Sequence, residues 1–188
     1  GLSIHPGAAK NKLINASQVA MEFHAMLPVH ERPESTEGYE GFCMLRDITS
    51  NIEEATMHYI IRDHDDEKFE EKKDRFYQIA VYLDSIYGDG TVEVEMKDSY
   101  YNMRRQIEPV MYIVDRAKAA MERLGITPYS VPVRGGTDGA RLSYMGLPCP
   151  NLCTGGMNFH GRYEYAVVEE MESCARILVE ILTAPELG

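Results

Sequence analysis

An arginine opens a glycine-rich turn in the second half of the chain, and its chemistry suits an anionic ligand. The string Arg134-Gly135-Gly136-Thr137-Asp138 follows a short apolar run and precedes a helical pattern. Amides exposed at a helix start bind anions, and an adjacent arginine can grip a carboxylate with two N–H groups. The string lacks the full glycine pattern of a dinucleotide site. Thr137 or Asp138 is expected to cap the helix.

His5 stands where a short apolar segment gives way to a loop. Pro6 follows it, and a proline restricts the preceding residue to an extended backbone, so the imidazole would be presented rigidly. Turn formation alone also accounts for a proline and a glycine at this place. From spacing, His5 is therefore either a presented functional group or part of a surface turn.

His160 lies in a loop with glycines on both sides. Gly155-Gly156 and Gly161 let the main chain bring the ring close to a ligand, and Glu164 follows at a distance suited to a hydrogen-bonding partner. Loops that follow strands in α/β layers commonly hold binding sites. A capping role in a flexible loop is the alternative, because loops concentrate function without guaranteeing it.

For two further groups of polar residues, spacing alone gives weaker support for a functional role. Asn102 follows three polar or aromatic residues at the junction of the two halves, where it could face a ligand or act as a hinge or cap. The string His64-Asp65-Asp66 has metal-binding residue types. However, it opens an amphipathic helix, where acids are expected for capping and for the helix dipole.

The first half of the chain predicts a ferredoxin-like unit. Helices are predicted over 15–27 and 65–87, the second from an apolar stripe at helical spacing. Strands are predicted over 42–48, 56–62 and 91–97, the last two from alternation, and the first two are expected to pair as a hairpin. Residues 1–4 resemble the remainder of a first strand. The order β-α-β-β-α-β is that of a split βαβ unit.

The second half predicts part of an α/β layer. Helices are expected over 107–124, from the 135–139 turn to about Met145, and over 167–182, with strands at 129–133 and 151–154. Two strands do not make a complete doubly wound sheet. The fold class is therefore α/β, with a ferredoxin-like α+β part first, and the two parts meet near residue 105.

Composition excludes several classes of function. The 188 residues carry 19 Lys+Arg against 30 Asp+Glu, a formal net charge of −11, which disfavours a nucleic-acid surface or a polybasic membrane surface. No apolar run reaches the ~18 residues of a spanning helix, and no signal peptide is visible. Four cysteines are sparse for a disulfide scaffold, so we expect a cytoplasmic protein.

Several separate strings, in the same order, resemble the dimeric zinc exopeptidases, the family of carboxypeptidase G and the aminoacylases. Within that family the resemblance is to the tripeptide aminopeptidases, and it extends over essentially the whole chain. The strings are 3–10, 36–42, 58–63, 98–103, 134–140 and 146–152, together with the loop of His160.

The resemblance implies a zinc-dependent aminopeptidase that releases the N-terminal residue from tripeptides. It implies a lid domain over 1–103 and the C-terminal part of a catalytic domain over 104–188. It also implies a homodimer formed through the lid, with small peptides as substrates and two zinc ions in the complete enzyme. His160 matches the last zinc ligand, and His5 matches a lid histidine that reaches the partner subunit's site and steadies the oxyanion. Arg62 and Arg134 resemble substrate-binding arginines, and Asn102 is a further candidate for substrate binding.

The chain departs from the family in its metal ligands. The family's first histidine ligand, bridging aspartate, paired glutamates and further aspartate have no counterpart here. A catalytic zinc takes about three protein ligands, so we expect this polypeptide alone to be inactive and not to retain zinc. The alternatives are a non-enzymatic dimerisation or peptide-binding module, and a related carboxypeptidase or amidohydrolase.

Overall fold

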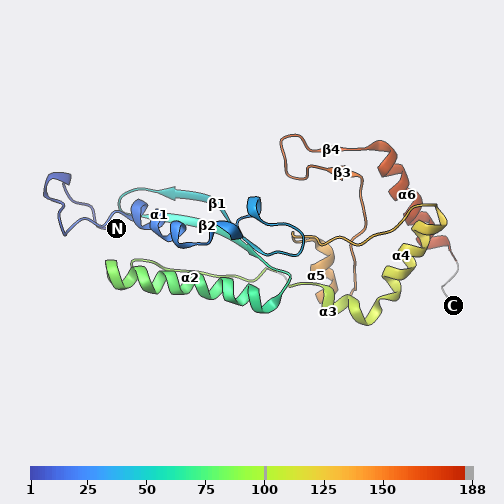
Figure 1. The fold of residues 1–188 in the computed structure, drawn as a ribbon, viewed down its shortest axis with the longest axis horizontal. Coiled ribbons are helices and arrows are strands. Elements are labelled where there is room, and N and C mark those ends of the chain that lie inside the picture. Colours follow the sequence, from blue (N-terminus) through green and yellow to red (C-terminus); the bar gives the residue numbers. More distant parts are fainter. Residues whose placement is uncertain (100, 185–188) are drawn as a thin grey trace. The chain divides into compact units, whose positions relative to one another are not determined.

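The chain divides into two compact units in the computed structural model, which describes residues 1–99 and 101–184 (Figure 1). Unit 1 comprises 1–97 together with 132–135, and unit 2 comprises 98–131 and 136–188. Tyr100, within one of the strings quoted above, lies outside the described residues. Each unit is described by itself.

Unit 1 is built from two helices and a hairpin whose ends are set by local capping. Helix α1 (Ala16–Met26) begins where the Asn15 side chain accepts from the N–H of Ser17. Helix α2 (Asp66–Tyr87) begins where Asp65 accepts from the N–H of Lys68, and it ends at Gly88. Both helices occupy the ranges that the sequence predicts.

The hairpin of unit 1 joins β1 (Phe42–Ser50) to β2 (Ala55–Arg62) in an antiparallel pair. Its register pairs Ser50 with Ala55 at the turn and Phe42 with Arg62 at the open end, with an irregularity between Leu45 and Asp47. This pairing confirms the predicted hairpin. Two predicted site residues, Arg62 and Arg134, lie at this open end.

The core of unit 1 lies between the hairpin and the two helices. Leu83 is completely buried, and the Phe23 and Phe76 rings contact each other at a centroid distance of 5.6 Å. Burial of such side chains is the main favourable term in folding. The buried cluster contains Val19, Phe23, Leu27, Cys43, Phe76, Ile79, Ala80 and Leu83.

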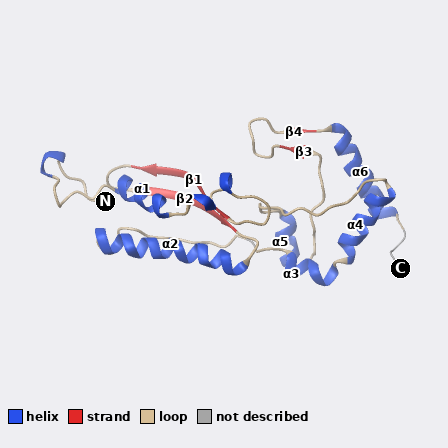
Figure 2. Cartoon of the chain, viewed as in Figure 1, coloured by secondary structure: helices blue, strands red, loops and turns tan. Residues whose placement is uncertain are grey.

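Unit 2 contains helices with two very short strands between them (Figure 2). Residues 107–124, predicted as one helix, form α3 (Arg104–Ile107), a 3-10 turn (Glu108–Val110) that contains Pro109, and α4 (Tyr112–Arg123). Proline lacks the N–H that a continuous helix needs. The other elements are α5 (Asp138–Tyr144), β3 (Gly156–Met157), β4 (Tyr165–Ala166) and α6 (Val168–Thr183).

The predicted outer strands are not strands among the described residues. Residues 1–4 contribute only an isolated bridge from Leu2 to Ile14, and 91–97, 129–133 and 151–154 are not in any sheet. Alternation predicts which side chains face inward, and Val92, Val94 and Met96 do pack against the core. A strand also requires a neighbouring backbone to pair with, which alternation does not reveal.

The class of the fold is mixed α/β, as the sequence predicts. In the described ranges, unit 1 has the two-stranded sheet β1–β2 where a four-stranded sheet was expected, and unit 2 has the two-stranded sheet β3–β4. The domain boundary at residue 103 stays a prediction. Over residues 1–99 and 101–184, no helix combines the length and the apolar character needed to cross a membrane.

Candidate functional site

The two predicted substrate-binding arginines of unit 1 lie at the open end of the hairpin. Arg62 is the last residue of β2 and pairs with Phe42, the first residue of β1. The guanidinium carbon of Arg134 lies 4.9 Å from the centroid of the Phe42 ring, a cation–π distance. Arg134 belongs to the segment 132–135, which is part of unit 1. The structure therefore places the backbone of Arg62 and the guanidinium of Arg134 next to the same aromatic residue, while the Arg62 side chain donates to the carbonyl oxygen of Ile61.

Arg134 is held by one residue of the loop between α1 and β1. Its Nη1 donates to the carbonyl oxygen of Thr36 at 2.7 Å, and its Nη2 donates to the Thr36 hydroxyl at 2.5 Å. Its Nε is buried and has no hydrogen-bond partner in the part of the chain that the structure describes. Thr36 lies within a string that carries the family resemblance, but the sequence analysis assigned it no role.

A buried ion pair supports the end of β2 beside these arginines. The Lys72 ammonium on α2 lies 2.8 Å from a carboxylate oxygen of Asp63, and the two side chains are 9% and 2% exposed. Gly41 permits this arrangement, because a Cβ there would clash with the Asp63 carboxylate. Sequence analysis missed the pair, although Lys72 sits at helical spacing within the apolar stripe of α2, at a position that should be apolar.

The imidazole of His64, next to this pair, has a lowered pKa. Burial lowers the pKa of its imidazole, the Asp63 carboxylate opposes this, and the positive charge of Arg134 lowers the pKa further. Its ring contacts that of Tyr39 edge-on at 5.2 Å.

His5 caps the first helical turn of unit 1 and is exposed. Its Nδ1 accepts from the N–H of Gly7 at 3.1 Å, within the 3-10 turn Pro6–Ala8. A backbone N–H can only donate, so the neutral ring carries its proton on Nε2. The turn therefore fixes a histidine whose outer nitrogen is a donor. The catalytic role of His5 stays a prediction.

His160 occupies the loop between β3 and β4 in unit 2. Its φ is +63°, in the left-handed region that non-glycine residues seldom adopt, and Asn158 shares this conformation at +56°. Glu164 accepts from the backbone N–H of His160 at 2.9 Å, so Glu164 orders the main chain of the loop. The ring is exposed. Its role as a metal ligand stays a prediction.

Asn102, also in unit 2, is engaged in local structure. Its side-chain oxygen accepts from the N–H of Arg104 at 3.0 Å, and its carbonyl oxygen accepts from the Tyr144 hydroxyl at 2.9 Å. The side-chain contact is a local turn just before α3, whose N-cap residue is Met103. Its substrate-binding role stays a prediction.

The described residues do not fit a complete zinc centre. In residues 1–99 and 101–184, no three His, Cys, Asp or Glu side chains lie close enough to hold a metal ion together. A structural zinc takes four protein ligands and a catalytic zinc about three. His160 would thus need ligands other than those that the described chain places around it.

The first part of the chain resembles a known kind of domain. Residues 1–88 match the family model described as the peptidase dimerisation domain. The predicted resemblance to dimeric exopeptidases is confirmed.

Several relatives carry the name of a particular peptidase. Peptidase T of Alkaliphilus oremlandii is 53% identical over 182 residues, covering 97% of this chain and 44% of its own length. Peptidase T of Bacillus licheniformis is 54% identical over 182 residues, with the same two shares. The chain is thus homologous to peptidase T along nearly all its length, and it spans less than half the length of these relatives.

A solved structure agrees on the fold. The crystal structure of a tripeptidase from Staphylococcus aureus superposes with a TM-score of 0.70 at 18% identity, covering 95% of this chain and 47% of that chain. At this identity the likeness concerns the fold.

Proposed function

We propose that this chain supplies the dimerisation lid and part of the catalytic domain of a metal-dependent aminopeptidase that removes the N-terminal residue from tripeptides. The observation that carries the proposal is the 53% identity to peptidase T over 97% of the chain. The lid would be residues 1–103, and 104–188 would belong to the catalytic domain. The enzyme would be a cytoplasmic homodimer joined through the lid.

Recognition of a short peptide is the part of the reaction that unit 1 supports directly. Arg134 has a buried Nε without a hydrogen-bond partner in the described residues, and Arg62 ends the strand that pairs with Phe42. Arginine binds carboxylates through two parallel N–H groups. We therefore assign the terminal carboxylate of a tripeptide to Arg134, with Arg62 as a second cation. Asn102, which belongs to unit 2, is a separate proposed substrate-binding residue. A carboxylate held at a fixed place selects peptides of one length.

His5 would supply a donor during the reaction. Because its Nδ1 accepts from Gly7, the proton of the neutral ring lies on Nε2, where it can stabilise negative charge that develops on the scissile carbonyl oxygen. We assign this role in the partner subunit's site. The turn Pro6–Ala8 pre-orders the ring, so little conformational freedom is lost when the charge forms.

Most of the zinc ligands would come from parts of the full-length enzyme other than this chain, and His160 would be the ligand that this chain contributes. A bound zinc supplies Lewis-acid polarisation and an activated water in hydrolases. The described residues lack a ligand set, so we propose that the 188-residue chain alone is catalytically inactive.

The test compares two preparations with tripeptides, dipeptides and tetrapeptides in the presence of zinc. The full-length peptidase that carries this chain is expected to release N-terminal residues from tripeptides, and the 188-residue chain is expected to show no turnover. Zinc-dependent turnover by the chain alone that is lost in His160→Ala, but kept in the surface control His58→Ala, would contradict the assignment. A full-length protein with no activity on any of these peptides would contradict the proposed function.

Self-association without catalysis is a second candidate function for the isolated chain. The match of residues 1–88 to a dimerisation domain favours it, because specific interfaces bury about 1,600 Å² in total and a lid can supply such an area. Light scattering is expected to show a dimer. A monomer at high protein concentration would argue against lid-mediated dimerisation.

A further inference from the structure

We propose that Thr36 positions Arg134 for a substrate carboxylate, an inference that rests on the proposed peptidase function. Thr36 lies between α1 and β1, in a segment with two 3-10 turns, Val29–Glu31 and Pro33–Ser35 (Figure 2). Arg134 is 98 residues further along the chain. Their contact joins two segments of unit 1 that sequence spacing could not relate.

Thr36 occupies one edge of the Arg134 guanidinium. Its carbonyl oxygen accepts from Nη1 at 2.7 Å and its hydroxyl accepts from Nη2 at 2.5 Å. A guanidinium presents five N–H groups in a rigid plane, so two hydrogen bonds on the edge formed by Nη1 and Nη2 fix the orientation of the whole group. The Phe42 ring, 4.9 Å away, limits tilting out of that plane.

The orientation leaves a defined set of donors unused. Nε is buried and has no hydrogen-bond partner within the described ranges, and Nη2 keeps a second N–H beside it. Buried N–H groups in folded proteins are nearly always paired, so an unpaired one calls for an acceptor. The edge formed by Nε and Nη2 matches the two oxygens of a carboxylate. Thr36 thereby determines which edge of Arg134 is available to a ligand.

The hydroxyl of Thr36 is itself held in a single donor–acceptor arrangement. It donates its only proton to the carbonyl oxygen of Arg32 at 2.9 Å. The same oxygen therefore has lone pairs directed to Arg134. A valine at position 36 would have nearly the same shape and would lose both interactions, whereas a serine would keep them.

The segment that carries Thr36 is anchored to the core of unit 1. Arg32 donates through Nη2 to Nε2 of His24 at 3.0 Å, and Nδ1 of His24 donates to the Tyr59 hydroxyl at 2.9 Å. Because an arginine can only donate, Nε2 of His24 is the acceptor and the ring proton lies on Nδ1. Arg32 thus links two sets of hydrogen bonds, from its side chain through His24 to β2 and from its carbonyl oxygen through Thr36 to Arg134, so the position of Arg134 depends on the folded core of unit 1.

The test measures kcat and KM of the full-length peptidase with a free tripeptide and with the same tripeptide as its C-terminal amide. For Thr36→Val we expect KM for the free acid to rise about tenfold with kcat nearly unchanged, because carboxylate binding contributes equally to the ground and transition states. The amide should show no such rise. Thr36→Ser should restore the wild-type KM, and Thr49→Val, an exposed threonine on β1, is the matched control.

The outcomes separate the inference from the function on which it rests. An active enzyme in which Thr36→Val leaves KM unchanged, or raises it equally for acid and amide, overturns the inference. An inactive full-length protein overturns the proposed function instead. The inference is then judged from the side-chain ¹⁵N NMR signals of Arg134: slow rotation of the guanidinium in the wild type and fast rotation in Thr36→Val support it, and fast rotation in the wild type overturns it.

Discussion

Unit 1 and unit 2 bury their apolar side chains in different ways. In unit 1 the aromatic and aliphatic side chains of both helices and the hairpin form one buried cluster. In unit 2 the buried apolar residues of the described ranges are small or few: Ile107, Ala117, Ala120, Ala140 and Ile177. Unit 1 therefore has the kind of core that stabilises a domain on its own, and unit 2 has a much smaller one.

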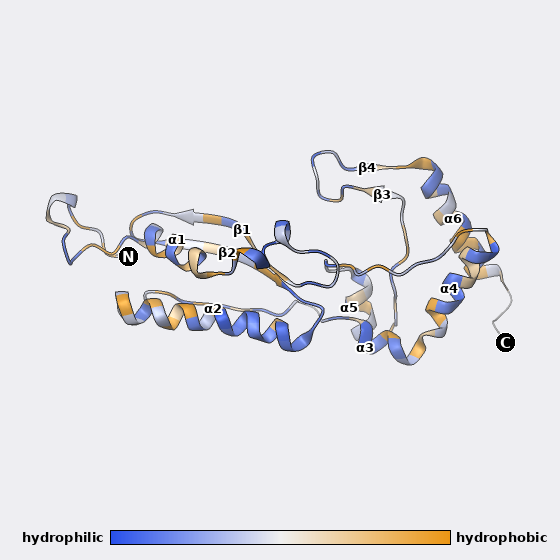
Figure 3. Cartoon of the chain, viewed as in Figure 1, coloured by the Kyte–Doolittle hydropathy of each residue, from blue (hydrophilic) through white to orange (hydrophobic). Residues whose placement is uncertain are grey.

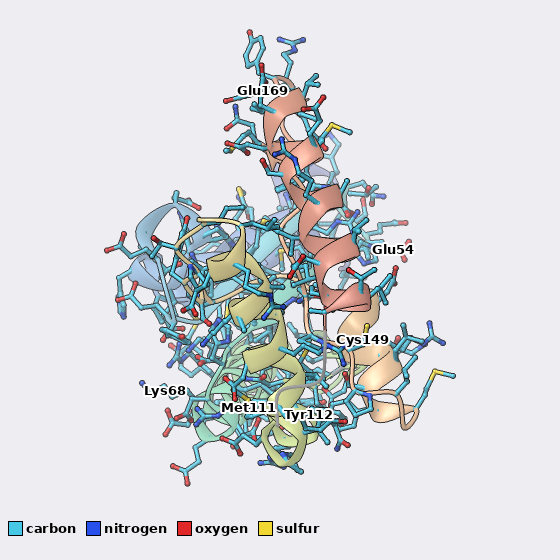
Figure 4. All side chains as sticks on the ribbon, turned by 90° about the vertical axis from the view of Figure 1, so that its right-hand side faces the viewer. Glu54, Lys68, Met111, Tyr112, Cys149 and Glu169 are labelled. Atoms are coloured by element: carbon cyan, nitrogen blue, oxygen red, sulfur yellow. The ribbon has the colours of Figure 1, made fainter. Side chains whose placement is uncertain are left out.

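The surface of unit 2 carries the apolar side chains that its core lacks. Met111 and Tyr112, where the 3-10 turn meets α4, are exposed (Figure 4), and on α6 Val168 and Leu182 are 64% and 80% exposed. Orange colouring recurs along α6, whereas α2 begins with hydrophilic turns and becomes apolar toward its end (Figure 3). Exposed apolar patches mark surfaces that contact other protein.

Polar contacts hold the helix pair of unit 2 together. The Arg116 side chain on α4 donates to the carbonyl oxygens of Ile181 and Ala184 at the end of α6, and Arg123 pairs with Glu180. Cations near a helix C-terminus are favourable but contribute modestly. The comparison predicts that variants in unit 1 cost more stability than matched variants in unit 2.

The largest effect is expected from breaking the buried ion pair of unit 1. Lys72→Ala leaves the Asp63 carboxylate buried without its counter-charge, and such a loss costs about 3–5 kcal/mol. Urea denaturation of the 188-residue chain measures it. Lys73→Ala, which affects a pair with the exposed Glu70 on the same helix, should cost about 0.2–1 kcal/mol. Equal losses in the two variants would contradict the burial argument.

The next largest effect on stability is expected from truncating a buried leucine of unit 1, compared with an exposed leucine of unit 2. Leu83 is 0% exposed, so Leu83→Ala leaves a cavity and should lower the free energy of unfolding by about 2–5 kcal/mol. Leu182→Ala removes an 80% exposed side chain from α6 and should change it by about 0.5 kcal/mol or less. A large loss in Leu182→Ala would mean that α6 is covered in solution, and this would break the comparison.

A smaller loss of stability is expected when acid protonates His24, which belongs to unit 1. Burial, reinforced by Arg32, lowers the pKa of His24 below 6.5, so the unfolded chain binds a proton more readily than the folded one. The stabilising contribution is therefore present above pH 6.5 and is lost as the pH falls below it, by at most about 1.4 kcal/mol per pH unit.

Stability measured from pH 7.5 to pH 5.5 checks this sign. The glutamine in His24→Gln can still accept from Arg32 and donate to Tyr59. The free energy of unfolding of this variant should fall less steeply with acid than that of the wild type. Thr49→Val should keep the wild-type slope. A His24→Gln curve parallel to the wild-type curve would show that His24 does not contribute to the slope.

The smallest effect comes from the ion pair of unit 2. Arg123 and Glu180 are 39% and 28% exposed, so Arg123→Ala should cost only about 0.2–1 kcal/mol. Arg75→Ala, which frees the less exposed Glu31 in unit 1, should cost more. The reverse order, read from the same denaturation curves, would weaken the distinction between the two units.

The candidate site was predictable from sequence only in part. The types and positions of Arg62, Arg134, His5 and His160 were visible as motifs, because turns and glycines leave local patterns. The partners of Arg134 were not visible, since Thr36 is 98 residues away and no periodicity relates the two. The left-handed backbone of His160 was also hidden, because residue type alone does not determine φ.

The sequence by itself determined the helices, the hairpin and the homology to peptidase T. Apolar spacing and capping side chains act within a few residues, so α1, α2 and the β1–β2 turn follow from local chemistry. Only the tertiary structure decided that residues 91–97 pack against the core without joining a sheet, that Lys72 finds Asp63, and that Arg134 returns to the lid. Those outcomes depend on which distant groups satisfy each other's charges and hydrogen bonds, and this is settled only when the chain has folded.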